Sequence, residues 1–311
     1  MLSVHNLINT TDLTRDDIAQ ILDTARGFEQ INARAIKKLP TLRGRTIVNL
    51  FLEPSTRTKS SFELACKRLG ADTLSVAGSS SSVVKGESLV DTIETLDAMH
   101  VDMFICRAKY AGSPEIITRT TKARVINAGD GKHAHPTQAL LDLYVMRRQF
   151  GHVDGLRVGI VGDCLHSRVV GSLVPALSKM GARVTLVGPQ SFLPAEPSVL
   201  GADATADFDA LLPDLDVVYM LRVQSERLEG AAMPSTREYY RLFGVGERRM
   251  AQMRPEAVIM HPGPVMRGVE LTSEALASER CLKNDQVAAG VSVRMAAIYL
   301  LLGGESNGVS D

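Results

Sequence analysis

The chain has 311 residues, more than the about 250–300 at which a single hydrophobic core usually stops growing, so its length favours two domains. Because 45% of the residues are hydrophobic and 23% are charged, the composition excludes a disordered or fibrous protein. The 35 basic and 35 acidic residues give a net charge of zero, so no charge excess points to nucleic acid or an anionic membrane as a partner.

Three features bear on the compartment of the protein. The four cysteines, at positions 66, 106, 164 and 281, form no C-x-x-C pair, which excludes a disulfide framework or a zinc knuckle and fits a reducing cytoplasm. Residues 1–17 lack the basic start and apolar run of a signal peptide, so we expect no export. The apolar stretch 287–302 is interrupted by Arg294 and is short for a bilayer, which predicts a buried helix.

The first half of the chain alternates helical and strand patterns. Thr14 and Asp17 have the spacing of a capping box before apolar residues at helical intervals, which predicts a helix over 15–30. The apolar run 46–52 is typical of a strand buried in a parallel sheet, and a polar turn and a helix that ends at Gly70 follow it. Later patterns predict strands at 71–76, 101–106 and 124–127, a mobile loop at 78–86, and helices at 88–99 and 137–150.

The second half begins after turn signals at 151–155, which we interpret as a domain boundary. Its patterns predict a helix over 169–180 and strands at 157–162, 183–187, 216–221 and 257–260. Strands that alternate with helices are typical of parallel sheets with helical crossovers. The sequence therefore predicts an α/β fold with two domains, each a parallel sheet flanked by helices.

Three hydroxyls and a guanidinium, in Ser55-Thr56-Arg57-Thr58, lie between a predicted buried strand and a predicted helix. The free N–H groups and the dipole of a helix N-terminus favour an anion, and these side chains suit phosphate. A plainer interpretation is that Ser55 or Thr56 only caps the helix and that Arg57 is solvated. The segment lacks the G-x-x-x-x-G-K-[ST] pattern of a nucleotide-binding P-loop.

A second polar segment, with His133, His135 and Gln138, opens another predicted helix after a glycine-rich turn. Two histidines two residues apart raise the question of a metal, but no nearby cysteine or carboxylate pattern completes a ligand set. A histidine and a glutamine at a helix start can instead donate to a carbonyl oxygen and accept from an amide N–H.

Arginines stand where ligands bind in open parallel sheets, beyond the carboxyl ends of the strands. Arg107 follows one predicted strand, and Arg222 and Gln224 follow another. Arg168 lies near a predicted helix start, where its charge opposes the helix dipole and is better explained by a bound anion. Arg107, Arg222 and Gln224, each taken singly, are more typical of a protein surface than of a ligand contact.

Two prolines in His261-Pro-Gly-Pro264 remove N–H donors at the end of a predicted strand and leave carbonyl oxygens free to accept. Recognition of ligand N–H groups by these carbonyls is one interpretation, and a rigid turn is the other. Arg294, inside the last predicted helix, needs a partner that offsets its desolvation, and we assign it a structural role.

Taken together, these segments resemble the catalytic chains of aspartate carbamoyltransferases, in order and over nearly the whole chain. The pair S-T-R-T and H-P-T-Q at this separation is highly specific to transcarbamoylases. The motifs are Glu53-Pro-Ser-Thr-Arg-Thr58, Ser61-Phe-Glu63, Lys85-Gly-Glu87, His135-Pro-Thr-Gln138, Arg222-Val-Gln224 and His261-Pro-Gly-Pro264. The resemblance implies carbamoyl transfer from carbamoyl phosphate to the α-amine of L-aspartate, a step of de novo pyrimidine biosynthesis. It implies no metal, cofactor or covalent nucleophile.

The same resemblance implies how the protein is organised. A carbamoyl-phosphate-binding domain would span 1–150 and an aspartate-binding domain 151–285, with a C-terminal helix in 286–311 that returns to the first domain. The expected assembly is a cytoplasmic homotrimer with active sites shared between subunits. Regulatory or dihydroorotase-like partner chains remain open, as does inhibition by nucleotides, and neither nucleic acid nor a membrane is expected as a partner.

The resemblance also implies roles residue by residue. Carbamoyl phosphate would be bound by Ser55, Thr56, Arg57, Thr58, Ser81, Arg107, His135, Gln138, Pro262, Gly263 and Pro264. Aspartate would be bound by Lys85, Arg168, Arg222 and Gln224, and Glu53 would pair with Arg168 and Arg227 on domain closure. The catalytic groups would be Arg57, Thr58, Lys85, Arg107 and His135, with Ser81 and Lys85 supplied by the neighbouring subunit. The acceptor of the amine proton stays open between the departing phosphate and His135.

Three alternatives compete with this interpretation. Ornithine carbamoyltransferases resemble the chain in the phosphate motif, but they have H-C-L-P at 261–264 and bind a cationic side chain, whereas Arg168 and Arg222 favour a dicarboxylate. A silent scaffold would have no need of every anion contact. A dehydrogenase would need a full G-x-G-x-x-G, of which Gly159 and Gly162 give only a part. Some relatives have leucine at position 263, and glycine there predicts a more flexible loop with its carbonyls retained.

Overall fold

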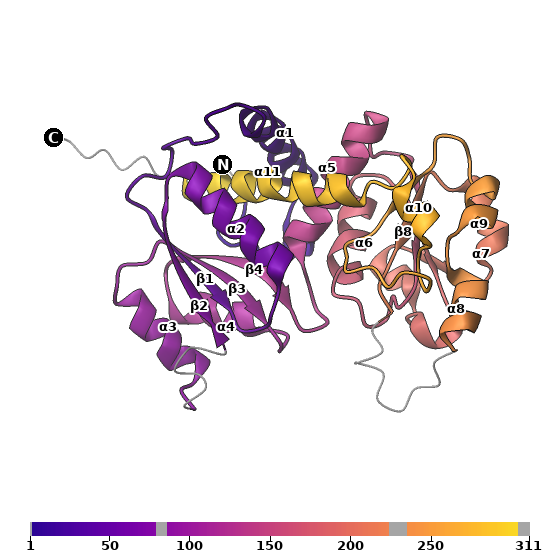
Figure 1. Cartoon of the computed structure of the whole chain (residues 1–311). Coiled ribbons are helices and arrows are strands. Elements are labelled where there is room, and N and C mark those ends of the chain that lie inside the picture. The colour runs from indigo at the N-terminus through magenta and orange to yellow at the C-terminus, as the bar shows by residue number, and fades with distance from the viewer. Residues whose placement is uncertain (1, 79–85, 224–234, 304–311) are drawn as a thin grey trace. The chain divides into compact units, whose positions relative to one another are not determined.

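The computed structural model describes residues 2–78, 86–223 and 235–303 (Figure 1). They form two compact units. Unit 1 is the chain up to Tyr144 together with the stretch from Ala288 onward, and unit 2 is Val145–Val287. The predicted site residues Ser81, Lys85, Gln224 and Arg227 lie outside the described residues.

Unit 1 is built on a parallel sheet of four strands in the order β2-β1-β3-β4 (Figure 1). The strands are β1 (Thr46–Phe51), β2 (Asp72–Ala77), β3 (Met103–Ala108) and β4 (Arg124–Asp130). The helices are η1 (Thr10–Asp12), α1 (Arg15–Asn32), α2 (Thr56–Leu69), α3 (Leu89–Asp97), α4 (Ser113–Thr120) and α5 (Pro136–Phe150). The sheet core contains Val48, Leu50 and Phe104, all fully buried.

Unit 2 is built on a parallel sheet of five strands in the order β7-β6-β5-β8-β9. The strands are β5 (Arg157–Val161), β6 (Arg183–Val187), β7 (Asp203–Thr205), β8 (Val217–Met220) and β9 (Val258–Met260). The helices are α6 (Val170–Lys179), η4 (Gln190–Phe192), η5 (Pro197–Leu200), α7 (Phe208–Leu211), η6 (Leu212–Asp214), α8 (Thr236–Phe243), α9 (Glu247–Gln252) and α10 (Ser273–Ala277). The predicted fold class, two parallel sheets flanked by helices, is confirmed.

The last helix, α11 (Lys283–Leu302), begins earlier than the predicted stretch 287–302. It is long and apolar enough to cross a membrane, but 67% of its most apolar window is buried within the protein, as in a core helix. Its contacts with α1 confirm the predicted return to the first domain. The Asn32 side-chain amide donates to Ser292 Oγ at 2.9 Å, and the rings of Phe28 and Tyr299 meet edge to face at 5.7 Å.

Helix α1 begins with the predicted capping box. Thr14 Oγ1 accepts from the Asp17 N–H at 3.1 Å, and Asp17 Oδ2 accepts from the Thr14 N–H at 2.9 Å. Ser3 adds a backbone and a hydroxyl donor to the same carboxylate. Burial alone would raise the pKa of Asp17, but the hydrogen bonds from Ser3 and Thr14 outweigh it and lower the pKa to about 2.

We expect the Asp17→Asn variant to lose up to about 2 kcal/mol of unfolding free energy at pH 7. Because the folded pKa of Asp17 lies below its unfolded value, this contribution is present above about pH 4 and is lost as the pH falls towards 2. Urea unfolding of both proteins at pH 7 and pH 3 measures the difference, which should be smaller at pH 3. A difference that does not change with pH would contradict the assignment.

Candidate functional site

The predicted site residues of unit 1 lie where the order of its strands reverses, between β1 and β3. Ligands of open parallel sheets bind beyond the carboxyl ends of the strands at such a point. Glu53 follows β1, and Arg107 lies near the end of β3 rather than beyond it, because β3 extends to Ala108. The loop after β4 leads to His135. Three adjacent strand ends therefore carry candidate site residues.

Two of the hydrogen bonds that Arg107 donates are near the upper limit of length. Its Nη1 donates to the Ala128 carbonyl at 3.3 Å, and its Nη2 donates to Glu53 Oε1 at 3.4 Å. The expectation that Glu53 pairs with Arg168 and Arg227 on closure stays a prediction. In this structure Glu53 pairs with Arg107, within its own unit. Both contacts are weak enough for a ligand oxygen to replace.

Helix α2 begins without the side-chain cap that α1, α3, α7, α8 and α10 have. Ser55 is the N-cap residue, with extended backbone, but within the described structure its hydroxyl makes no capping hydrogen bond. Thr14 and Ser88, by contrast, each accept from the N–H three residues on. The first-turn N–H groups of α2 are therefore not capped by Ser55 and can bind an anion. Thr58 is buried there, and Arg57 is exposed.

His135 and Gln138 stand at the start of α5. The buried His135 accepts from the N–H groups of Gln138 and Ala139, at 3.0 and 3.3 Å, through its carbonyl. The Gln138 side-chain Nε2 donates to Asp142 Oδ1 at 3.0 Å. Sequence analysis missed Asp142, which is fully buried. The one signal in the sequence is that Asp142 follows Gln138 by four residues, which places both side chains on the same helix face and within reach of each other.

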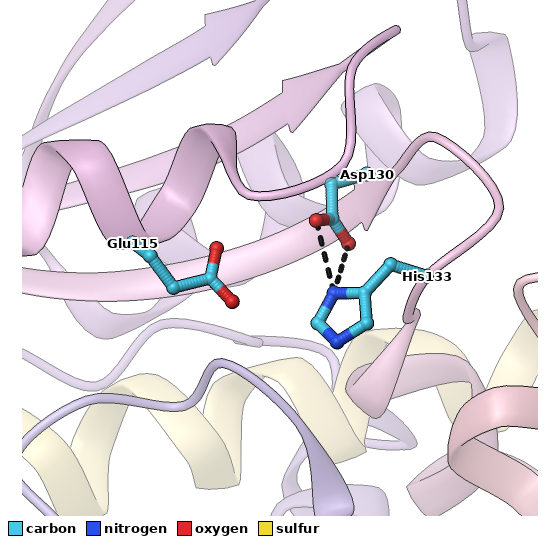
Figure 2. A group of neighbouring side chains, drawn as sticks. All are labelled: Glu115, Asp130 and His133. Carbon is cyan, nitrogen blue, oxygen red and sulfur yellow. Dashed lines mark hydrogen bonds and ion pairs between the residues drawn. The ribbon is translucent and has the colours of Figure 1, made fainter.

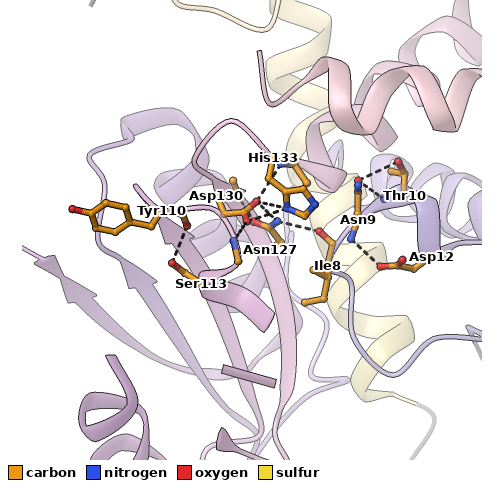
Figure 3. A network of polar contacts seen from close by, with 12 residues as sticks. Ile8, Asn9, Thr10, Asp12, Tyr110, Ser113, Asn127, Asp130 and His133 are labelled. Atoms are coloured by element: carbon orange, nitrogen blue, oxygen red, sulfur yellow. Dashed lines mark hydrogen bonds and ion pairs between the residues drawn. The ribbon is translucent and has the colours of Figure 1, made fainter. Parts of the chain in front are cut away.

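Asp130, which sequence analysis also missed, anchors the loop that leads to His135. Its Oδ1 accepts from Asn127 Nδ2 at 2.7 Å and from the Ala134 N–H at 3.2 Å, and its Oδ2 lies 3.0 Å from His133 Nδ1 (Figure 3). Gly131 is required in this loop, because a Cβ there would lie 2.7 Å from the Ala111 backbone nitrogen. The position of His135 is thus set by a buried carboxylate.

Glu115, Asp130 and His133 bring atoms of metal-binding type within 4.8 Å of one another (Figure 2). The sequence around the histidines completes no ligand set, because Asp130 is close to His133 in the chain but Glu115 is brought to them only by the fold, from α4. Both Asp130 oxygens already accept hydrogen bonds from the protein, so loop anchoring accounts for the arrangement. That the reaction needs no metal stays a prediction.

In unit 2 the strand order reverses between β5 and β8, and predicted site residues again lie there. Arg168 lies between β5 and α6 and is buried, and Arg222 follows β8. The turn that carries Arg168 is fixed by Asp163, a fully buried residue that sequence analysis missed. Asp163 Oδ1 accepts from the His166 N–H at 3.1 Å and lies 2.8 Å from His166 Nδ1.

Glu270 connects the segment of Arg222 to the loop after β9, and sequence analysis missed it as well. This fully buried carboxylate accepts from the Val223 N–H at 3.0 Å and from the Met266 N–H at 2.6 Å. It also lies 3.4 Å from Nε2 of His261, whose Nδ1 accepts from the Gly263 N–H at 2.8 Å. Gly263 has a φ of 68°, which a leucine adopts only with strain.

The cysteines are not candidates for a nucleophile. Cys66, Cys106 and Cys164 are buried, and burial raises the pKa of each thiol, that of Cys66 to about 12. Burial also raises the pKa of the partly exposed Cys281. A thiol with a raised pKa holds its proton at neutral pH and reacts slowly.

Two family models match the chain. Residues 5–148 match the carbamoyl-P binding domain of aspartate/ornithine carbamoyltransferases, and residues 154–301 match their Asp/Orn binding domain. The chain is 51% identical over 301 residues to the aspartate carbamoyltransferase catalytic subunit of Thermobifida fusca, which covers 97% of this chain and 96% of that protein. It is 47% identical over 302 residues to that of Desulforapulum autotrophicum, with 97% of each covered.

Solved structures of both kinds of enzyme share the fold. An aspartate transcarbamoylase from Trypanosoma cruzi, in complex with N-(phosphonacetyl)-L-aspartic acid, matches with a TM-score of 0.86 and 31% identity over 94% of each chain. An ornithine carbamoyltransferase from Pyrococcus furiosus matches with a TM-score of 0.86 and 29% identity, over 96% of this chain and 97% of that one. The fold alone therefore does not distinguish the two activities.

Proposed function

Because the chain belongs to the aspartate/ornithine carbamoyltransferase family, we infer that it is an aspartate carbamoyltransferase. It transfers the carbamoyl group of carbamoyl phosphate to the α-amine of L-aspartate, giving N-carbamoyl-L-aspartate and phosphate, in de novo pyrimidine biosynthesis. The observation that carries this conclusion is 51% identity over 97% of the chain to an enzyme of that name.

The reaction joins two anionic substrates. The neutral amine nitrogen attacks the carbamoyl carbon, the carbonyl oxygen gains negative charge, and the bond from that carbon to the phosphate oxygen then breaks. The protein must therefore neutralise the phosphate and carboxylates, align the amine, and stabilise the oxyanion. Alignment of two bound reactants can supply about 7 kcal/mol or more of the barrier reduction.

In our proposal, unit 1 binds carbamoyl phosphate and corresponds to the predicted domain 1–150, joined by the helix of 286–311. Ser55, Thr56 and Arg57, with the first-turn N–H groups of α2, bind the phosphate. Thr58, Arg107 and His135 bind the developing oxyanion, and Ser81 belongs to the same site from the neighbouring subunit. The uncapped start of α2 and the long hydrogen bonds from Arg107 to Ala128 and Glu53 support these roles.

Unit 2, which corresponds to the predicted domain 151–285, binds aspartate in the same proposal. Arg168, Arg222 and Gln224 hold the two carboxylates, together with Lys85. Gln138 of unit 1 and the carbonyls at Pro262, Gly263 and Pro264 accept from the carbamoyl amide group. Support comes from Arg168 and Arg222, which follow the two strands at the reversal of the sheet. On closure Glu53 exchanges Arg107 for Arg168 and Arg227, which frees Arg107 for the substrate.

We further propose a cytoplasmic homotrimer with shared active sites. The resemblance of Ser81 and Lys85 to residues that the family supplies from a neighbouring subunit supports this assembly. Whether regulatory or dihydroorotase-like chains join the trimer is a separate question, which the mass of the complex purified from its own cell would answer.

Phosphate release tests the function. The purified chain is given carbamoyl phosphate with L-aspartate, with L-ornithine or with no amine, and its mass is measured by light scattering. We expect aspartate-dependent release from a particle of about three times 33.6 kDa. Release with ornithine alone would move the chain to the other branch of the family. A trimer without release under any condition would favour a silent scaffold.

A further inference from the structure

The orientation of the Gln138 side-chain amide is determined by its neighbour on α5. Gln138 Nε2 donates to Asp142 Oδ1 at 3.0 Å, and both side chains are buried. A carboxylate accepts hydrogen bonds and donates none, so it must face the NH₂ end of the amide. The Gln138 oxygen is therefore directed away from Asp142, as a hydrogen-bond acceptor of fixed orientation.

Arg294 of α11 lies near enough to Asp142 for the two charges to attract each other. Arg294 is buried, and burial lowers the pKa of its guanidinium to about 10, while attraction to Asp142 acts in the opposite direction. Its Nη1 donates to the Gly290 carbonyl at 3.2 Å, and its guanidinium lies 5.0 Å from the centre of the Phe62 ring. Because Arg294 is protonated at neutral pH, it stabilises a buried carboxylate at position 142.

Gly290 leaves the space that this arrangement needs. A Cβ at position 290 would lie 2.5 Å from Arg294 Nη1 and 3.4 Å from Leu141 Cδ2. Any side chain there would displace the guanidinium. Gln138, Asp142, Arg294 and Gly290 therefore form one buried group, from an amide in the candidate site to the glycine of α11.

We propose that Asp142, backed by Arg294, is a positioning residue that makes the carbamoyl pocket select a ligand NH₂ over a methyl group. The proposal rests on the proposed function, in which Gln138 contacts the amide group of carbamoyl phosphate. A ligand NH₂ donates to the fixed Gln138 oxygen. A methyl group of similar size leaves that buried acceptor without a donor, which is how polar sites reject an analogue that lacks the polar group.

Acetyl phosphate is the probe, because it replaces the NH₂ of carbamoyl phosphate with CH₃. Its reaction is balanced in the same way: the aspartate nitrogen bonds to the acetyl carbon, the bond to the phosphate oxygen breaks, and the departing phosphate takes up the proton that the amine loses. The measured quantity is kcat/KM for carbamoyl phosphate divided by kcat/KM for acetyl phosphate, both with saturating L-aspartate. A general loss of stability would lower both rates and leave this ratio unchanged.

We expect Asp142→Asn to lower the ratio roughly tenfold, the value of about one hydrogen bond. Asparagine has an NH₂ of its own, which can donate to the Gln138 oxygen. The Gln138 amide can then also take the flipped orientation, in which its NH₂ rather than its oxygen faces the ligand. The Gln138→Ala variant gives the reference value of the substrate ratio for a pocket that lacks the Gln138 oxygen. In the double variant Asp142→Asn/Gln138→Ala the ratio should equal that of Gln138→Ala, because Asp142 acts through Gln138.

Asp17→Asn is the matched control. Asp17 is another buried carboxylate of unit 1, and its hydrogen bonds go to Ser3 and Thr14 at the start of α1. We expect it to lower stability and leave the substrate ratio at the wild-type value. If Asp142→Asn does not fold, Gly290→Ala replaces it. That variant keeps both charges but displaces Arg294, and it should lower the ratio in the same direction.

An unchanged substrate ratio in the folded Asp142→Asn variant would overturn the proposal. If that variant does not fold, an unchanged ratio in Gly290→Ala would overturn it. So would a lowered ratio that persists when Asp142→Asn is added to Gln138→Ala. The wild-type assay separates this result from a failure of the proposed function. A wild-type chain that forms no carbamoyl aspartate contradicts the function, whereas an active wild type with an unaffected variant ratio contradicts the positioning role alone.

Discussion

Replacement of Arg107 by alanine is expected to lower kcat by two to three decades, or about 3–4 kcal/mol, while the chain stays folded. In the proposed mechanism the guanidinium donates to the oxygen that becomes negatively charged, so its loss affects the transition state more than the bound substrate. Steady-state kinetics give kcat, and circular dichroism reports the fold. Glu53, which loses its partner, is partly exposed and remains accessible to water.

The matched control for this variant is Arg45→Ala. Arg45 forms an ion pair of 2.7 Å with Asp102, and both precede strands of the same sheet, at the amino ends of β1 and β3. Removal of this partly exposed pair should cost about 1 kcal/mol of stability or less and leave kcat unchanged. If Arg107→Ala kept a kcat within about threefold of the wild type, Arg107 would not be an oxyanion donor.

Replacement of Arg222 by alanine is expected to lower kcat/KM for aspartate by about two to three decades, an effect of about 3–4 kcal/mol. Arg222 lies beyond the carboxyl end of β8, where it would pair with a substrate carboxylate. In the alanine variant that carboxylate has lost this charged partner. KM for carbamoyl phosphate should stay within a few-fold of the wild-type value, because Arg222 is not among the proposed contacts of that substrate. Initial rates with each substrate varied in turn separate the two effects.

Arg254→Ala provides the control for unit 2. Arg254 forms a 2.5 Å ion pair with Asp216. Asp216 precedes β8, whereas Arg222 follows it, so the ion pair lies at the opposite end of this strand from Arg222. We expect near-normal kinetics from this variant, since exposed ion pairs contribute little. Equal losses in Arg222→Ala and Arg254→Ala would indicate a general weakening of unit 2 rather than the loss of an aspartate contact.

Much of the fold could be predicted because its longer elements carry strong local signals. The Thr14–Asp17 capping box and Gly70, with its left-handed φ of 81°, mark helix ends that the structure reproduces. The elements missed include β7, helices α7 to α10 and the 3-10 helices η1, η4, η5 and η6, all of three to eight residues. So few residues complete at most about two helical turns, and periodicity has no room to show.

The site residues that could be predicted from the sequence are those that directly follow a strand or lie at the start of a helix. The buried carboxylates Asp130, Asp142, Asp163 and Glu270 were missed, although they hold the segments that carry His135, Gln138, Arg168 and Arg222. Acidic residues are mostly exposed in proteins, so a single acid in a sequence gives no sign of burial. About half of their donors are backbone N–H groups, which exist at nearly every position and leave no sequence pattern.

Unit 1 is completed by residues that follow the whole of unit 2 in the chain. Residues 145–287 are translated between its two parts, and α11 then supplies the partners of Phe28, Asn32 and Phe62. On the ribosome these contacts therefore form only after the whole of the second unit has been synthesised, whereas the second unit is one continuous stretch of chain. The unit whose synthesis begins first is thus the one whose sequence is completed last.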